Sequence, residues 1–329
     1  MSVDWEQLKK LVQDHQRFLL TSHLRPDCDA LGSELAMAQV LRSCGKEVVI
    51  VNDHAVPESL QFIDPKNEIK TLDEYQAESA PDPEVIMILD TSAWVQLGRM
   101  AEYIQQFSGT VAVMDHHVGE DKINAHMLKD TSAEATGRLV AEAAHALGVR
   151  LTPEIATPAF AAIATDTGWF RFSSVSERTY ALAGELIGAG ADPADIYGQL
   201  YERDTVGRVR LRGLILSRTE LEMDGRLVHT YVRLEDFEVS GANPTDTEDA
   251  INLTLAVAGT QVALIFIHHP ENENIKISFR SRGLFDCNQM AGKFGGGGHK
   301  AASGAHVAGE LDDVRQVVLD AVRAEMKDA

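Results

Sequence analysis

The sequence has 329 residues, of which 44% are hydrophobic and 24% are charged, an ordinary balance for a globular protein. Its length predicts about two domains, each large enough to bury its own core. The formal net charge of −20 argues against long duplex DNA as the main ligand, because the chain would repel an extended polyanion. A small anionic substrate is compatible with this charge if basic residues gather locally.

The chain shows no mark of a membrane protein or a secreted one. No apolar run approaches the roughly 18 residues of a membrane span, and the N-terminal stretch MSVDWEQLKKLVQDHQ is polar, unlike a signal peptide. The three cysteines, Cys28, Cys44 and Cys287, are odd in number and lack a CxxC spacing, which argues against a disulfide framework or a zinc ribbon. We therefore expect a cytoplasmic protein that does not contact a membrane.

Apolar runs alternate with helical patterns over the first part of the chain. Four runs are typical of buried strands: 17–22, 47–52, 85–89 and 110–114. Helical spacing occurs at 30–45, 94–107 and 133–148. This alternation indicates βαβ units, so we expect an α/β domain with a parallel sheet over residues 1–190, followed by a linker over 191–206.

The pattern changes after the linker, and a smaller α/β domain is expected over residues 207–329. Strand-like segments occur at 227–234, 261–269 and 274–282. Helical patterns occur at 247–259 and 311–326.

Residues that can bind metal follow the predicted strands of the first domain. The run 17–22 leads into His23, the run 85–89 leads into Asp90, and the run 110–114 leads into the triplet Asp115, His116 and His117. Ligands of parallel α/β sheets gather at the carboxyl ends of the strands, so we expect these residues to converge. A fourth apolar run, 159–165, leads into Asp166, and this run could be either a strand or a helix.

Asp27 and Asp29 lie in a tight loop between His23 and the next predicted helix, because Pro26 prevents the strand from continuing. Two carboxylates two residues apart in an irregular loop can face different metal ions. The alternative is that they only cap the helix that begins near Ala30.

The proposed ligands are two histidines and at least four aspartates, with no cysteine. Such mixed ligands suit Mn²⁺, Fe²⁺, Co²⁺ or Zn²⁺, and the excess of carboxylates favours Mn²⁺. This many carboxylates would over-neutralise a single ion, whereas two cations that share a carboxylate would balance them. A pair of cations can activate a water and stabilise the leaving oxygen in phosphoester hydrolysis.

The second domain contains a candidate anion site. The four glycines 295–298 and His299 can expose backbone N–H groups to a phosphate, although a flexible linker is the alternative reading. Arg280 and Arg282 would share one face if their segment is a strand. These arginines could bind the phosphate of a nucleotide in this otherwise acidic chain.

Four motifs occur in the order HLRPDCDALGS, ILDTS, DHH and ATDTG, and this ordered set resembles the phosphoesterase motifs of the DHH superfamily. The segments ISFRSR and GGGGHKAASG resemble the DHH-associated C-terminal substrate-binding domain. The resemblance spans nearly the whole chain, and it is closest to the bifunctional oligoribonuclease and PAP phosphatase subfamily. It implies a DHH domain with a parallel sheet, followed by a smaller DHH-associated α/β domain.

The resemblance implies a role for each matched residue. Two Mn²⁺ ions would be held, one by His23 and Asp27 and the other by Asp29, His116 and Asp166, with Asp90 shared between them. His117 would contact the scissile phosphate, and Asp115 would orient the neighbouring imidazoles. The far end of the substrate would be bound by Arg280, Ser281, Gly297, Gly298 and His299.

The implied activity is hydrolysis of very short RNA oligonucleotides to mononucleotides, together with dephosphorylation of 3′-phosphoadenosine 5′-phosphate (PAP). The expected partners are therefore short RNAs and small phosphorylated nucleotides. One alternative is a phosphodiesterase for cyclic or linear dinucleotides of the cyclic di-AMP type. Another is a non-catalytic nucleotide-binding module, although every expected ligand position is filled. The oligomeric state, with a homodimer among the options, stays open.

Overall fold

The computed structural model describes residues 3–78, 81–119, 121–269 and 274–328. The chain forms two compact units, Met1–Arg203 and Asp204–Ala329, each with its own sheet. Helix α8 (Pro193–Tyr201) occupies most of the segment in which we expected a linker. Within the described ranges, no helix is both long and apolar enough to cross a membrane.

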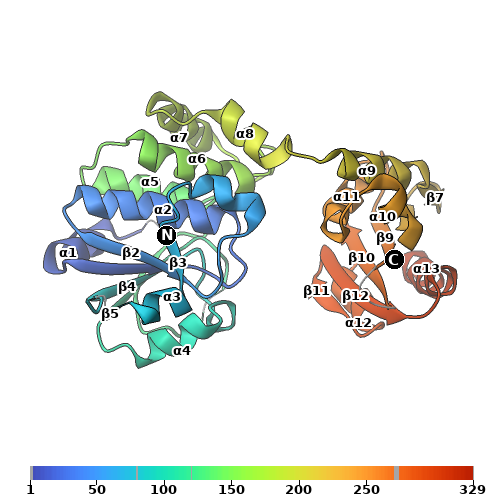
Figure 1. Ribbon diagram of the computed structural model, residues 1–329, viewed down its shortest axis with the longest axis horizontal. Coiled ribbons are helices and arrows are strands. Elements are labelled where there is room, and N and C mark those ends of the chain that lie inside the picture. The colour runs from blue at the N-terminus through green and yellow to red at the C-terminus, as the bar shows by residue number, and fades with distance from the viewer. Residues whose placement is uncertain (1–2, 79–80, 120, 270–273, 329) are drawn as a thin grey trace. The chain divides into compact units, whose positions relative to one another are not determined.

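The first unit is built on a parallel sheet (Figure 1). Its strands are β1 (Arg17–Thr21), β2 (Glu47–Asn52), β3 (Ile69–Thr71), β4 (Val85–Leu89), β5 (Thr110–Asp115) and β6 (His126–Lys129). They lie in the order β3-β2-β1-β4-β5-β6. The chain direction across the sheet reverses between β1 and β4, and ligands of open α/β sheets bind at such a switch point.

Helices cover both faces of this sheet. One face carries α1 (Trp5–Asp14), α2 (Cys28–Ser43), α5 (Thr136–Ala146) and α6 (Pro153–Asp166), with η1 (Glu58–Ile63) and α7 (Glu177–Gly188) packed around them. The other face carries α3 (Leu72–Ala77), η2 (Trp94–Gln96) and α4 (Arg99–Gln106). Because both faces are covered, every residue of β4 is buried, and the strand has the continuous apolar sequence from which we predicted it.

The run 159–165, for which strand and helix were both open, belongs to helix α6. Pro153 stands at the first turn, where its missing N–H costs nothing. The helix shows no clear amphipathic period because α2, α5 and α7 surround it. Its packing against α2 is tight, since a Cβ at Gly32 would lie 2.4 Å from the carbonyl oxygen of Pro158.

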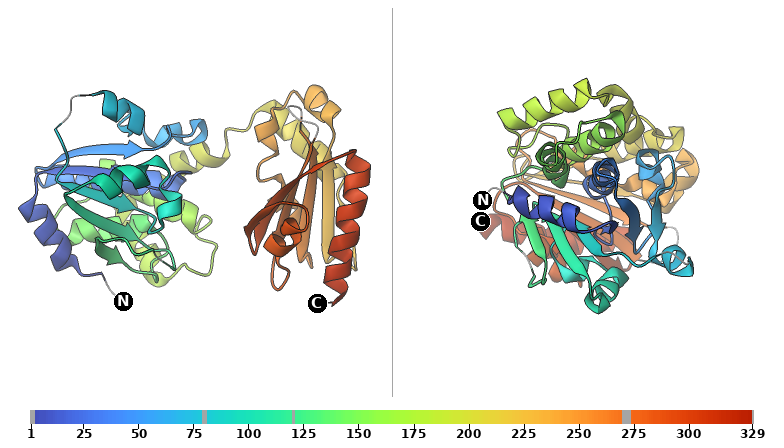
Figure 2. Two further views of the ribbon diagram at one scale, coloured as in Figure 1. Left: turned by 90° about the horizontal axis from the view of Figure 1, so that it is seen from below. Right: turned by 90° about the vertical axis from the view of Figure 1, so that its left-hand side faces the viewer.

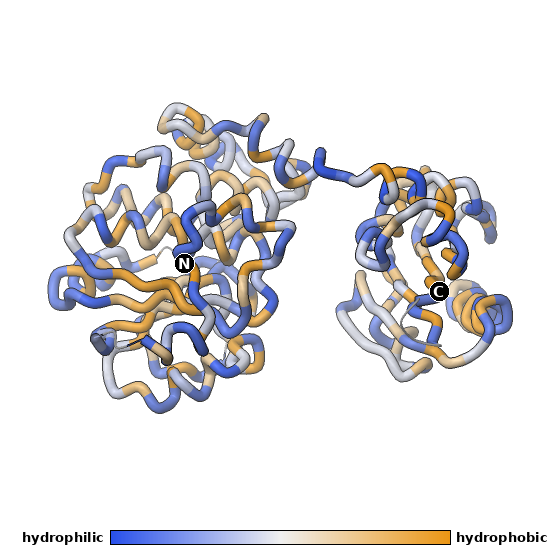
Figure 3. Tube along the Cα trace, viewed as in Figure 1, coloured by the Kyte–Doolittle hydropathy of each residue, from blue (hydrophilic) through white to orange (hydrophobic). Residues whose placement is uncertain are grey.

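The second unit has a mixed sheet. Its strands are β7 (Glu220–Glu222), β8 (Leu227–Val232), β9 (Val262–His268), β10 (Asn274–Ser281), β11 (Gly297–His299) and β12 (Ala302–Ala308). They lie in the order β11-β12-β10-β9-β8-β7, and β8 and β9 are parallel while the other pairs are antiparallel. Figure 3 shows hydrophobic stretches within the sheets of both units.

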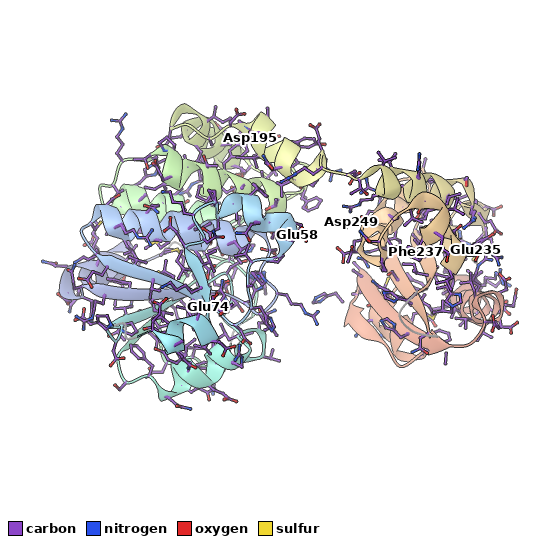
Figure 4. All side chains as sticks on the ribbon, viewed as in Figure 1. Glu58, Glu74, Asp195, Glu235, Phe237 and Asp249 are labelled. Atoms are coloured by element: carbon purple, nitrogen blue, oxygen red, sulfur yellow. The ribbon has the colours of Figure 1, made fainter. Side chains whose placement is uncertain are left out.

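Two helical layers enclose the second sheet. One contains α9 (Val206–Ser217), α10 (Leu234–Ser240), η3 (Pro244–Thr247) and α11 (Ala250–Leu255). The other contains α12 (Cys287–Gly292) and α13 (Leu311–Asp328), and Figure 2 shows α13 running along the sheet. Phe237, labelled in Figure 4, comes from α10 and packs in the core of the first layer. The predicted fold class, a parallel α/β domain followed by a second α/β domain, is confirmed.

Candidate metal centre

Three strands of the first sheet lead into residues that can bind metal. His23 follows β1, Asp90 follows β4, and β5 ends at Asp115 and continues into His116 and His117. Because β4 lies between β1 and β5 and all three are parallel, these ends meet at one edge of the sheet. That edge includes the switch point between β1 and β4.

One cluster consists of His23, Asp27 and Asp90, whose ligand atoms all lie within 4.8 Å of one another. The distance from His23 Nε2 to Asp90 Oδ2 is 3.4 Å. Asp27 is also the N-cap of α2, because its Oδ1 accepts hydrogen bonds from the backbone N–H groups of Asp29 and Ala30, at 2.9 and 3.0 Å. The capping role that was the alternative for Asp27 therefore exists, and the same carboxylate belongs to the cluster.

A second cluster consists of Asp29, His116 and Asp166, which come from α2, the loop after β5 and the end of α6. His116 Nε2 lies 3.7 Å from Asp29 Oδ2 and 3.5 Å from Asp166 Oδ2. The same nitrogen is 3.6 Å from Asp90 Oδ1. The two clusters are therefore contiguous.

The ring of His116 is oriented as a metal ligand. Its Nδ1 lies 3.2 Å from the carbonyl oxygen of Ala133, which can only accept a hydrogen bond, so Nδ1 carries the proton. Its Nε2 is buried and has no hydrogen-bond partner among the described residues. Nε2 thus faces three carboxylates at 3.5 to 3.7 Å, and a cation between these groups would neutralise their charges. These donors fit a divalent metal ion.

Asp90 faces the two clusters with different oxygens. Oδ2 faces His23, whereas Oδ1 faces His116 and accepts a hydrogen bond of 2.8 Å from the hydroxyl of Thr136. The side chain is only 1% exposed, and the backbone has a φ of +63°, where Asp and Asn are tolerated better than most residues. A fixed carboxylate with its oxygens directed to separate groups of ligands is suited to bridging two cations.

The side chain of Asp29, from α2, is buried against the first turn of α5. The backbone N–H groups of Thr136 and Gly137 donate to its two carboxylate oxygens, at 2.8 and 2.9 Å. Burial, followed by the charges of Asp90 and Asp166, raises the pKa of Asp29 well above its usual value. Burial also raises the pKa of Asp166. Cations bound between these carboxylates would relieve the repulsion among their negative charges and would displace protons from Asp29 and Asp166.

Asp115 orients His117. Its Oδ1 accepts hydrogen bonds from the backbone N–H and from Nδ1 of His117, at 3.0 and 2.9 Å, while Oδ2 accepts one from the hydroxyl of Ser92 at 2.7 Å. Burial would raise the pKa of Asp115, but hydrogen bonds from His117, Ser92 and Lys129 outweigh it and hold the pKa below its usual range. The bond to Asp115 in turn raises the pKa of His117, whose side chain is 52% exposed.

The sequence motifs did not assign a role to several residues that support this site: Glu34, Ser92, Lys129 and Thr136. Ser92 lies within the motif ILDTS, so its proximity to Asp90 was the available clue. Lys129 is opposite Asp115 in the register of β5 and β6, but β6 itself was not predicted. Thr136 opens α5, where a threonine has no distinctive pattern.

Glu34 is a buried carboxylic acid near the metal centre. Its Oε2 accepts a hydrogen bond of 2.9 Å from Asn52 Nδ2, and its Oε1 has no partner among the described residues. Burial raises the pKa of Glu34 to about 8. Nothing in the helical pattern around it distinguishes this glutamate from one on a solvated face.

Arg280 and His299 lie on one face of the second sheet. Arg280 of β10 is paired with Ala302 of β12, and His299 of β11 is paired with that same alanine from the other side. Residues in register on neighbouring strands project to the same face, so two basic side chains flank a small one. Ser281 follows Arg280 and points to the opposite face, where its hydroxyl donates to the carbonyl oxygen of Phe285 at 2.8 Å.

Gly297 and Gly298 form an edge strand with His299, not a flexible linker. The backbone N–H of Gly298 donates to Asn288 Oδ1 at 2.9 Å. Its φ is +145°, and a Cβ there would lie 2.7 Å from the carbonyl oxygen of Ala302. The glycine is therefore needed for the close approach of β11 to β12. Arg282 lies just beyond the end of β10.

Comparison with known proteins identifies both units. A family model described as the DHH family, N-terminal domain, matches residues 17–163, and a DHHA1 domain model matches residues 224–328. A relative from Thermus thermophilus named bifunctional oligoribonuclease and PAP phosphatase NrnA is 34% identical over 310 residues, which cover 93% of this chain and 89% of that protein. The protein of the same name from Bacillus subtilis is 27% identical, and the match covers 95% of this chain and 96% of that protein.

A solved structure agrees with these matches. An exopolyphosphatase-related protein from Bacteroides Fragilis is 27% identical with a TM-score of 0.87, and the match covers 97% of this chain and 95% of that one. Enzymes of the DHH family are metal-dependent, and this chain carries a matching cluster of acidic and histidine side chains. The resemblance drawn from the motifs is confirmed, and the chain belongs to the DHH family of phosphoesterases, with a DHHA1 domain as its second unit.

Proposed function

We propose that this enzyme hydrolyses very short RNA oligonucleotides to mononucleotides and removes the 3′-phosphate of PAP. The observation that carries the proposal is Asp90, whose two oxygens face two separate groups of metal-capable residues. Phosphoester hydrolysis is the chemistry that a pair of cations favours. Support for the substrate class comes from the two relatives named oligoribonuclease and PAP phosphatase, which match over nearly the full chain.

The proposed ligand sets follow the two clusters. One cation would be held by His23 and Asp27 and the other by Asp29, His116 and Asp166, with Asp90 shared. We propose Mn²⁺, because mixed imidazole and carboxylate ligands suit it. When bound, the two cations neutralise charge on the reacting phosphate and lower the pKa of the attacking water.

His117 would contact the scissile phosphate. Its Nδ1 is engaged with Asp115, so Nε2 is the atom that can reach a substrate. The raised pKa of His117 favours the protonated ring, whose Nε2–H can donate to a phosphate oxygen and stabilise its developing charge. Asp115 keeps this ring in one orientation.

The DHHA1 domain would bind the part of the substrate that does not react. Arg280 and His299 present basic groups on one face of the sheet, and Ala302 between them leaves room for a phosphate or a sugar. Gly297 and Gly298 add a backbone edge without side chains. We assign Ser281 a supporting role, because its hydroxyl already holds the turn that follows β10.

A substrate panel tests this proposal. The purified protein with Mn²⁺ would be offered RNAs of two to five residues, PAP, linear and cyclic dinucleotides, and pyrophosphate. We expect turnover of the short RNAs and of PAP. Turnover of cyclic dinucleotides alone would favour the rival phosphodiesterase, and binding without turnover of any substrate would favour a non-catalytic module.

The role of Asp90 is tested by Asp90→Asn. Asparagine tolerates the left-handed backbone and can still accept the hydrogen bond of Thr136, but it is a poor bridge between cations. We expect turnover to be abolished while the fold persists. The control is Asp224→Asn, which makes the same change at an exposed residue of the second unit with a φ of +59°. Near-normal turnover by Asp90→Asn would refute the shared carboxylate.

A further inference from the structure

Lys129 is a largely buried cation beside the metal centre, and the proposed function leaves it without a role. It is the last residue of β6, and it lies opposite Asp115 in the parallel register with β5. Its side chain is only 10% exposed. Lysine is rarely buried to this extent unless its ammonium group has partners.

Among the residues that the structure describes, the ammonium group contacts three acceptors around the loop after β5. Its Nζ lies 3.0 Å from Asp115 Oδ2, and it donates to the hydroxyl oxygen of Ser92 and to the carbonyl oxygen of Gly119, each at 2.6 Å. The hydroxyl of Ser92 in turn donates to Asp115 Oδ2 at 2.7 Å. One side chain therefore links the end of β6 to the loops that follow β4 and β5.

These contacts hold both ends of the segment that carries His116 and His117. Asp115 precedes the two histidines and Gly119 follows them. With Oδ2 of Asp115 engaged by Lys129 and Ser92, Oδ1 is left to accept both hydrogen bonds from His117. The ring of His117 is half exposed, so this carboxylate is its main restraint against rotation.

A purely structural role is the competing explanation. Buried ion pairs add little net stability, because the cost of removing both charges from water offsets their attraction. Packing alone would also not explain why the contacts of Lys129 converge on the carboxylate that orients His117. His116 is secured separately, through Ala133, so loss of Lys129 should spare the metal ligands.

We propose that Lys129 is a positioning residue for phosphoester hydrolysis, which through Asp115 and the carbonyl group of Gly119 fixes the orientation of His117. This inference rests on the proposed function, because it assumes that His117 contacts the substrate. It adds Lys129, from β6, to the residues that support the candidate active site.

A double-mutant cycle of Lys129→Met and His117→Ala tests the inference. Partners that orient an active-site group typically contribute about 10- to 100-fold to activity, so Lys129→Met should lower kcat by about that factor while KM and the affinity for Mn²⁺ change by less than about threefold. In the His117→Ala background the same substitution should cost less than about threefold, because the two residues act in one chain of contacts. Multiplicative losses would overturn the inference.

Two controls separate positioning from charge and from folding. Lys122→Met removes an exposed positive charge from the same loop region and should leave kcat unchanged. Lys129→Arg keeps the charge and the donors and should restore part of kcat. If Lys129→Met does not fold, Lys129→Gln takes its place in the cycle.

A readout without substrate keeps this inference separate from the proposed function. The ¹⁵N shifts of the His117 ring, assigned by comparison with His117→Ala, report which nitrogen carries the proton. At a pH high enough to remove one proton from the ring, we expect the remaining proton on Nδ1 in the wild type and in Lys122→Met, and a mixture of tautomers in Lys129→Met. An unchanged His117 ring in Lys129→Met would overturn the inference even if all substrates are hydrolysed, whereas an inactive wild type with these shifts would refute only the proposed function.

Discussion

Gly137 packs closely against α6 and also contacts the metal ligand Asp29. Gly137→Ala should therefore lower both the stability of the first unit and its affinity for metal. A Cβ at this position would lie 2.5 Å from the Cβ of Ala162 and 3.1 Å from the carbonyl oxygen of Ala159, so α5 must move away from α6. Such overpacking costs about 1–3 kcal/mol, and the helix preference of alanine returns at most about 1 kcal/mol. We expect a net loss of stability of about 0–2 kcal/mol, which lowers Tm by up to about 8 °C.

The movement should also weaken metal binding, because the backbone N–H of Gly137 donates to Asp29. Thermal unfolding with and without Mn²⁺, together with calorimetric Mn²⁺ titration, measures both effects. Gly184→Ala is the matched control, since this glycine lies within α7 and a Cβ there would meet nothing within 4 Å. The free energy of unfolding of Gly184→Ala should be about 0.5–1 kcal/mol higher than that of the wild type. If Gly137→Ala raises Tm as much as Gly184→Ala does and leaves Mn²⁺ affinity unchanged, the argument from packing is wrong.

Three further predictions concern charge. Burial raises the pKa of Glu34 from 4.5 to about 8, so folding opposes the ionisation of this carboxyl group. The wild type should therefore lose stability relative to Glu34→Gln as pH rises from 4.5 to about 8, and above this range the difference in Tm between the two proteins should stay constant. A difference in Tm that is the same at every pH would contradict this. Because the pKa values of Asp29 and Asp166 are raised, protons compete with the cations, and calorimetric Mn²⁺ affinity should fall as pH is lowered; equal affinity at all pH values would contradict it. Removal of metal by EDTA should lower Tm, since a ligand at a hundred times its Kd stabilises a protein by about 2.7 kcal/mol, and an unchanged Tm would argue against a resident metal.

The framework of the fold could be predicted because its central strands are buried on both faces. β1, β4 and β5 have continuous apolar sequences, and the polar residue that ends each run marks the edge where ligands gather. α6 could not be assigned in this way, because a helix surrounded on most sides loses its amphipathic period. β3 and β6, with three and four residues, are too short to produce a pattern.

The contacts within the candidate site depend on what the tertiary structure brings together. The sequence placed Asp90 at a strand end, but the direction of its two oxygens is set by His23, His116 and Thr136, which come from three other segments. The pairing of Arg280 and His299 across Ala302 requires the register of three strands. Side-chain orientations of this kind cannot be predicted from local sequence patterns, because they depend on residues from distant segments.

The central claim is that two cations share Asp90, and electron paramagnetic resonance of bound Mn²⁺ tests it most directly. The wild type should bind two Mn²⁺ per chain with the spectrum of a spin-coupled pair, and Asp90→Asn should retain at most one, without coupling. One uncoupled ion per chain in the wild type, or an intact coupled pair in Asp90→Asn, would contradict the claim.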